Sequence, residues 1–287
     1  MLSLLQSRRV RGSAGEPLPD VFEEFRKTGI RFLRGQYVLI AAGAGTGKSG
    51  LVLSVALKSA VPTLYFSADS DAFTQLTRSI SIVTGSTLED STKAVLEDDL
   101  DHVRDSLSGI PIRFNYEASP TLDTIEISIE AYEEVYGEYP ALIIIDNITN
   151  VRLGGDGDDD DPFSGLEGLN DYLHDMARKT GSCVISLHHV TGPYNDADKP
   201  IPLSGVKGQI SRVPEMILTG HRTGPNSVAW SKVKCRVDKA DPSGNLSAEL
   251  TFEGDKMQFR DPTVSSPHNI IWEDLSDHPT VNDPWAM

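Results

Sequence analysis

Short apolar runs recur along this chain, and segments of helical length separate them. The runs that predict strands are residues 37–41, 63–66, 110–114, 142–145 and 183–187. The segments that predict helices are residues 49–59, 71–83, 121–136 and 166–179. A strand that is apolar on every residue must be covered on both faces. The pattern therefore predicts an α/β fold in which helices flank a mostly parallel, twisted sheet.

The sequence pattern changes after residue 215. The apolar segments become short and are separated by tight turns, which predicts antiparallel hairpins at the C-terminal edge of the sheet. The tail, residues 263–287, contains three prolines and neither lysine nor arginine. We therefore expect one core domain at residues 19–262, between a flexible leader at 1–18 and an acidic, flexible tail at 263–287. The tail segment 272–285 is a candidate binding site for a protein partner.

Composition limits the class of protein and the compartment. The 287 residues are 24% charged and 39% hydrophobic, which excludes wholesale disorder. No apolar run approaches the roughly 18 residues of a membrane span, and the first residues do not resemble a secretory signal. Two cysteines, Cys183 and Cys235, are too few for a disulfide framework or a zinc cluster. We expect a cytoplasmic protein that does not enter a membrane.

A glycine-rich segment between the first predicted strand and the first helix gives the strongest functional signal. Glycines let successive backbone N–H groups point inward around a polyphosphate, and the helix N-terminus adds partial positive charge. Lys48 would then reach the β- and γ-phosphates of ATP, and the Ser49 hydroxyl would bind Mg²⁺. The alternative is a glycine-rich turn with a surface lysine. The predicted phosphate loop consists of Ala42, which replaces the glycine of the strict pattern, and Gly43, Ala44, Gly45, Thr46, Gly47, Lys48 and Ser49.

Asp146 directly follows the apolar run at residues 142–145. The carboxyl ends of parallel strands face the ligand crevice, so its carboxylate can hold the magnesium shell through water. After a phosphate loop, such a carboxylate indicates a nucleotide hydrolase.

The order of these motifs resembles the RecA/DnaB-like P-loop ATPase core over about residues 28–262. In that family the acid that activates water ends the strand after the phosphate-loop helix. The resemblance assigns this general-base role to Asp69, where helicases of the family have a glutamate. The alternative is that Asp69 caps the helix that begins near Asp71.

The resemblance continues in the strand at residues 184–190. His189 falls where DnaB-type proteins carry a glutamine, and His-Val-Thr at 189–191 is similar to the RadA-like version. A neutral imidazole can hydrogen-bond a γ-phosphate and report its loss to the following loop. The alternative for the pair His188 and His189 is a transition-metal site.

Three basic residues, Lys232, Lys234 and Arg236, alternate along a predicted strand, so we expect them to share one face. In hexameric members of the resembled family, a Lys-x-Arg pair here reaches the neighbour's nucleotide as the arginine finger, and Lys234 and Arg236 match it. A finger supplied in trans implies a homo-oligomeric ring or filament. The alternative is a solvated cationic edge strand that blocks edge-to-edge pairing.

In the resembled family, the loops after Asp146 and His189 grip single-stranded DNA. The candidate phosphate contacts in and beside them are Arg152, Lys199, Lys207 and Arg212. The first loop also carries five aspartates at residues 156–161, which would repel DNA. We expect that segment to be solvated or to bind a divalent cation.

These features predict a DNA-dependent ATPase that acts on single-stranded DNA in recombination or replication, as a RecA-like recombinase or annealing protein or as a DnaB-like helicase. No N-terminal helical domain of the replicative helicase kind is visible, which favours the compact recombination type that phages encode. One alternative is a Mg²⁺-dependent DNA nuclease with a nucleotide-binding core. The other is a nucleotide-switched scaffold similar to KaiC-like proteins.

The net charge of −16 does not exclude DNA as a ligand. Three segments, residues 87–105, 156–161 and 263–287, together carry −14 of it. The rest of the chain is nearly neutral, so we expect a local DNA site on an otherwise repellent particle, with strongly salt-sensitive binding.

Overall fold

The computed structural model describes residues 3–152, 164–190, 192–206 and 209–262. The aspartate loop at 156–161, Lys207 and the tail at 263–287 lie outside these residues, and the expectations for them stay predictions.

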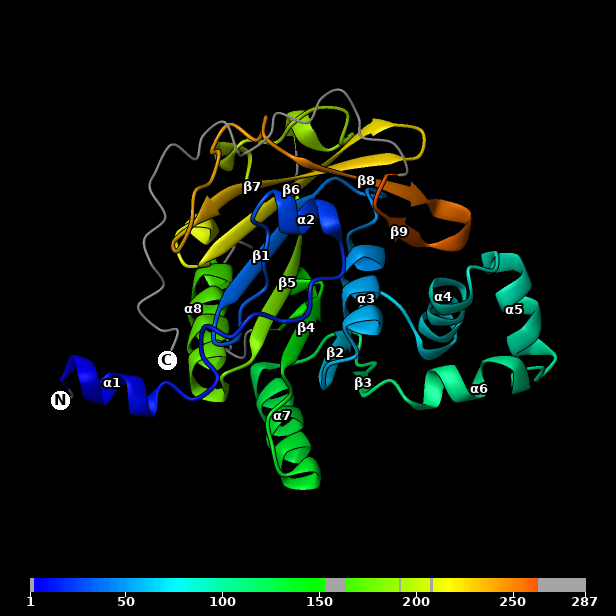
Figure 1. Ribbon diagram of the computed structural model, residues 1–287, viewed down its shortest axis with the longest axis horizontal. Coiled ribbons are helices and arrows are strands. Elements are labelled where there is room, and N and C mark those ends of the chain that lie inside the picture. The colour runs from blue at the N-terminus through cyan, green and yellow to red at the C-terminus, as the bar shows by residue number, and fades with distance from the viewer. Residues whose placement is uncertain (1–2, 153–163, 191, 207–208, 263–287) are drawn as a thin grey trace.

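Nine strands form a single sheet in the order β3-β2-β4-β5-β1-β6-β7-β8-β9 (Figure 1). The strands from β3 to β6 pair in parallel, and β7, β8 and β9 continue the sheet antiparallel at one edge. This arrangement confirms the predicted α/β fold class, with a mostly parallel sheet and antiparallel strands at its C-terminal edge. The strands are β1 (Tyr37–Ala42), β2 (Thr63–Ser67), β3 (Ile112–Asn115), β4 (Leu142–Asp146), β5 (Cys183–His189), β6 (Met216–Gly224), β7 (Ser227–Cys235), β8 (Ala248–Glu253) and β9 (Gln258–Arg260).

Helices cover both faces of the sheet, which explains why β1 and residues 142–145 of β4 are apolar on every residue. In β1, Val38 and Ile40 pack into a core with helices α2 and α3, whereas Leu39 packs into a second core with α7 and α8. No helix among the described residues is long and apolar enough to cross a membrane. The helices are α1 (Leu4–Val10), α2 (Glu23–Lys27), α3 (Lys48–Ser59), α4 (Ala72–Thr84), α5 (Leu88–Leu96), α6 (Asp101–Ser108), α7 (Leu122–Tyr136) and α8 (Ser164–Thr180).

The acidic segment at residues 87–105 folds into α5 and most of α6. Thr87 caps α5 by accepting a hydrogen bond from the Asp90 backbone N–H. Together with α4, these helices lie to one side of the sheet (Figure 1). Most of their acidic side chains are exposed, and only Val103 of α6 is fully buried.

The leader contains structure at both of its described ends. Ser3 and Gln6 form a capping box at the start of α1. Pro17 pairs with Leu33 in an isolated bridge, and Leu18 packs into the core with 5% of its surface exposed.

Lys232 does not share a cationic face with Lys234 and Arg236, so that expectation is wrong. An irregularity in the β6–β7 pairing places Lys232 opposite Leu218 and Lys234 opposite Ile217. Lys232 is 2% exposed, and its Nζ lies 2.6 Å from the Asp238 carboxylate. It is a buried structural cation.

Candidate functional site

The glycine-rich segment forms the turn between β1 and α3. Gly47 is the N-cap of α3 and has φ of 94°, in the left-handed region. A side chain at Gly47 would also collide with Phe259, because its Cβ would lie 2.9 Å from that ring. On the other side of the loop, a Cβ at Gly43 would lie 2.3 Å from the Asn195 carbonyl oxygen. The loop is therefore closely packed between the β8–β9 hairpin and the segment that follows β5.

Lys48 lies inside this loop and is only 6% exposed. Its Nζ donates hydrogen bonds to the carbonyl oxygens of Ala42 and Gly43, both at 3.0 Å. Burial lowers the pKa of Lys48 to about 8, although the carboxylates of Asp146 and Asp69 oppose the shift. A cation held this way is desolvated and close to where a phosphate would bind.

Asp146 ends β4 and is 3% exposed. Its Oδ2 accepts a hydrogen bond of 2.8 Å from the Tyr65 hydroxyl, and its carboxylate also accepts one from Ser49. Burial raises the pKa of Asp146, while these two hydrogen bonds favour the ionised form. The end of β4 and the first turn of α3 are thus joined by a hydroxyl–carboxylate pair.

Asp69 lies two residues beyond the end of β2 and is exposed. Its Oδ1 accepts a hydrogen bond of 2.7 Å from Nδ2 of Asn150, in the short helix η1 (Ile148–Asn150) after β4. The N-cap of α4 is Asp71, whose Oδ1 accepts from the Thr74 backbone N–H at 2.8 Å. Asp71, rather than Asp69, therefore caps α4.

His189 ends β5, and its Nδ1 lies 3.2 Å from the Lys48 Nζ. Burial and the nearby Lys48 charge lower the pKa of His189, and Asp69 opposes them. His188 is 3% exposed, its Nδ1 has no hydrogen-bond partner among the described residues, and burial lowers its pKa to about 4. Among the described residues, no three His, Cys, Asp or Glu side chains are grouped so that they could hold a metal ion.

We expect the buried His188 to make the free energy of unfolding depend on pH. The ordinary pKa of 6.5 exceeds the folded value of about 4, so between these values the unfolded chain binds more protons. The free energy of unfolding should therefore be highest above pH 6.5, where His188 is neutral in both states. It should fall by about 3 kcal/mol as the pH falls from 6.5 through 4. Urea unfolding of wild type and His188→Gln between pH 7 and 4 should show a flatter profile for the variant. The exposed His102→Gln control should follow wild type; equal profiles for all three proteins would contradict this role.

Lys234 and Arg236 lie far from the phosphate loop of their own chain. Cys235 pairs with Met216, which lies beside Val38 on β1. Along β1, Ala42 at the start of the phosphate loop lies four residues beyond Val38, a distance of about 13 Å. Their side chains instead donate to the carbonyl oxygens of residues 211–213. Burial lowers the pKa of Lys234 to about 8, with a further contribution from Arg236.

The candidate DNA contacts occupy separate places. Arg152 follows η1 and pairs with Thr121 in an isolated bridge. Lys199 lies over the Tyr194 ring, with Nζ 5.4 Å from the centroid. Arg212 is exposed, and its carbonyl oxygen accepts hydrogen bonds from Lys234 and Arg236.

The sequence does not point to three residues that contact the candidate site: Tyr65, which contacts Asp146, Asn150, which contacts Asp69, and Arg222, which contacts Gly45. The Arg222 guanidinium donates to the Gly45 carbonyl oxygen from the end of β6. The pairing of β2 with β4 points to Tyr65, because Tyr65 lies opposite Ile144, two residues before Asp146. No sequence pattern marked Asn150 or Arg222.

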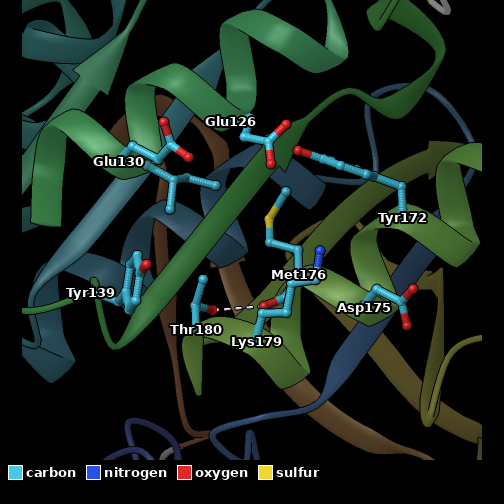
Figure 2. A pocket seen from close by; sticks show the side chains of 9 residues that line it. Glu126, Glu130, Tyr139, Tyr172, Asp175, Met176, Lys179 and Thr180 are labelled. Carbon is cyan, nitrogen blue, oxygen red and sulfur yellow. Dashed lines mark hydrogen bonds between the residues drawn. The ribbon is translucent and has the colours of Figure 1, made fainter.

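A separate cavity of about 210 Å³ lies between α7 and α8. Figure 2 shows the carboxylates of Glu126 and Glu130 above the thioether of Met176, with Tyr172 at one side. Burial, together with the acids on α7, raises the pKa of Tyr172 to about 12. None of the predicted site residues lines this cavity, so it is distinct from the phosphate loop.

Solved structures share the fold of this chain. An isolated ATPase domain matches with a TM-score of 0.74 at 17% identity, over 90% of this chain and 96% of that domain. A DnaB-like replicative helicase, described with its interactions with primase, has the same TM-score and identity; the match covers 90% of this chain and 65% of the helicase. The RadB recombinase matches with a TM-score of 0.55 at 15% identity, over 85% of this chain and 99% of that one.

Two curated relatives are much closer in sequence. The gene 65 protein of Mycobacterium phage L5 is 61% identical over 261 residues, which cover 89% of this chain and 97% of the relative. The gene 65 protein of Mycobacterium phage D29 is 63% identical over 229 residues, 78% of this chain and 98% of the relative. No protein-family model matches the chain. The chain therefore belongs to the family of these phage gene 65 proteins, and its fold is that of a RecA/DnaB-like P-loop ATPase core.

Proposed function

We propose that this protein is an ATPase of DNA metabolism that binds ATP and is stimulated by single-stranded DNA. The observation that carries the proposal is the convergence of Lys48, Asp146 and His189 on one glycine-rich loop, with Asp69 nearby. A glycine-rich turn with a surface lysine does not account for a buried Lys48 beside two carboxylates. The fold shared with helicase and recombinase ATPase domains supports the same assignment.

Each side chain has a role that its position supports. Lys48 would exchange its two carbonyl partners for phosphate oxygens, because a charge-assisted bond to phosphate is stronger than a bond to a neutral carbonyl. Asp69 would accept a proton from the attacking water. His189, with its lowered pKa, would be a neutral hydrogen-bonding partner of the γ-phosphate.

The residues present fit a magnesium ion bound with the nucleotide. Asp146 is a buried carboxylate with a raised pKa, and it accepts a hydrogen bond from the Ser49 hydroxyl. A nearby cation would stabilise its ionised form and lower that pKa. Mg²⁺ in nucleotide sites is held by one or two side chains together with phosphates and water. Ser49 and Asp146 would hold the ion, which would neutralise charge on the β- and γ-phosphates.

The positions of Lys234 and Arg236 favour action in trans. Their separation from their own phosphate loop exceeds the reach of a lysine or arginine side chain, so a finger role requires a neighbouring copy. We therefore propose a homo-oligomer, either a ring or a filament, in which these residues complete the adjacent site.

The proposed DNA contacts are Arg152, Lys199, Lys207 and Arg212. The segment after β5 carries Lys199 and packs on the phosphate loop through Asn195 and Gly43. Loops placed this way can couple nucleotide state to a bound strand. The fold of this core is compatible with strand annealing, strand exchange and duplex unwinding.

ATP hydrolysis with and without single-stranded DNA tests the proposal. We expect DNA to stimulate wild type, and Lys48→Ala to reduce ATP binding by roughly 10²-fold because a desolvated charge contact is lost. The control Lys93→Ala, on the surface of α5, should match wild type. Equal activity in wild type and Lys48→Ala would contradict the proposal, as would DNA cleavage with Mg²⁺ and no ATP, which indicates a nuclease. Nucleotide binding without turnover, with or without DNA, would instead support a scaffold.

A further inference from the structure

One hydrogen-bond partner of the phosphate loop, Arg222, lies far from it in the sequence. For backbone N–H groups to face a bound phosphate, the carbonyl groups of the loop must face outward, where they accept hydrogen bonds from protein groups or from water. Protein groups that donate to these carbonyls therefore help to fix the conformation of the loop.

The carbonyls of Ala42 and Gly43 accept from a backbone N–H of the neighbouring strand end, from the loop itself and from Lys48. The Ala42 carbonyl accepts from the Val190 backbone N–H at 3.2 Å, and the Gly43 carbonyl accepts from the Thr46 hydroxyl at 2.9 Å. Lys48 also donates to Ala42 and Gly43. In the proposed function it leaves both carbonyls for a phosphate, and each carbonyl keeps another donor.

The Gly45 carbonyl has a different kind of donor. It accepts from Nη2 of Arg222, a residue 177 positions away in the sequence. Gly45 has φ of 70°, and a Cβ built on it would lie 3.4 Å from the same Nη2. The guanidinium therefore lies next to Gly45, a residue of the turn with a left-handed backbone conformation.

Arg222 itself is held in place by the sheet. It lies near the end of β6 and pairs with Val228 of β7. Its backbone N–H donates to the Ala197 carbonyl oxygen at 2.7 Å. The backbone of Arg222 is thus fixed between a strand and the segment after β5, while its exposed side chain extends to the loop.

We infer that Arg222 is a positioning residue for nucleotide binding, which holds the Gly45 carbonyl outward so that the loop N–H groups face the phosphates. This inference rests on the proposed nucleotide site and adds a residue from outside its motifs. Because the loop would surround the β-phosphate of both ATP and ADP, Arg222 should affect the two nucleotides equally. A group in direct contact with the γ-phosphate would affect ATP alone.

The test measures affinities for fluorescent ATP and ADP analogues by anisotropy titration of the whole chain. We expect Arg222→Ala to weaken both by a similar factor of about 10 to 100, the range for a lost hydrogen bond to a charged group. Arg222→Lys, which keeps a cationic donor, should recover most of the affinity. The turnover at saturating ATP should fall much less than the affinity. Arg104→Ala, on the exposed face of α6, is the control for loss of a surface guanidinium.

Two results would overturn the inference: unchanged affinities in Arg222→Ala, and a loss confined to ATP. If the thermal midpoint of Arg222→Ala without nucleotide falls enough to explain weaker binding, Arg222→Gln, which keeps much of the side-chain stem, replaces it in the same comparison, and the same two results decide. Wild type that binds neither nucleotide would contradict the proposed function itself, whereas normal binding by Arg222→Ala would contradict only the role of Arg222.

Discussion

Replacing Arg236 by alanine is expected to lower the maximal rate of ATP hydrolysis by about 10³- to 10⁵-fold, the range for loss of an arginine finger. ATP affinity should change much less than the rate, because an arginine finger acts mainly on the charge that develops in the transition state. The rate under saturating ATP and DNA, with affinity measured separately, checks both parts. Full activity in Arg236→Ala would instead support a structural role, in which Arg236 only donates to the carbonyl oxygens of Arg212 and Val213.

Mixing variants shows whether the finger acts in trans. Arg236→Ala retains its phosphate loop, and Lys48→Ala retains its finger, so an equal mixture should recover about a quarter of wild-type activity if subunits exchange at random in a head-to-tail assembly. A mixture of Lys48→Ala with Asp146→Asn is the matched control, since both changes damage the same site. Activity in neither mixture would contradict a shared site.

The sheet was largely predictable because its physical cause is local. Strands covered on both faces are apolar over most of their length, and β1, β4 and β5 carry that signal in the sequence. The phosphate loop and Asp146 follow from the same pattern, since both lie at the carboxyl ends of such strands. Helices α5 and α6 were harder to predict, because their many exposed acids obscure the short apolar faces that pack on the fold.

Long-range contacts in the site could not be predicted from spacing. Alternation along a strand groups Lys232 with its basic neighbours. The irregular β6–β7 pairing breaks this alternation. Arg222 reaches Gly45 only because β6 pairs in parallel with β1, so that both strands end at the same edge. Asn150 reaches Asp69 in the same way, across the adjacent ends of β2 and β4.

Replacing Asp69 by asparagine is expected to lower the maximal rate of ATP hydrolysis by about 10²- to 10⁴-fold, the range for loss of a general base. The amide keeps the size of the side chain and a hydrogen-bond partner for Asn150, so nucleotide affinity should change little. Single-turnover hydrolysis, measured beside nucleotide binding, separates these effects. A rate within a few-fold of wild type would contradict the assignment of Asp69 as the base.

Two further variants connect the rate to geometry. Asp69→Glu restores the length found in the resembled helicases, so it should hydrolyse ATP at least as fast as wild type if the shorter carboxylate limits proton transfer. Asp71→Asn is the control, because Asp71 caps α4 and accepts from Thr74; this change should lower stability by at most about 1 kcal/mol and leave the rate unchanged. If Asp71→Asn slowed hydrolysis as much as Asp69→Asn, the placement of α4 rather than proton transfer would explain both losses. A slow Asp69→Glu variant would show that the loop between β2 and α4 is built around the shorter carboxylate and its bond to Asn150.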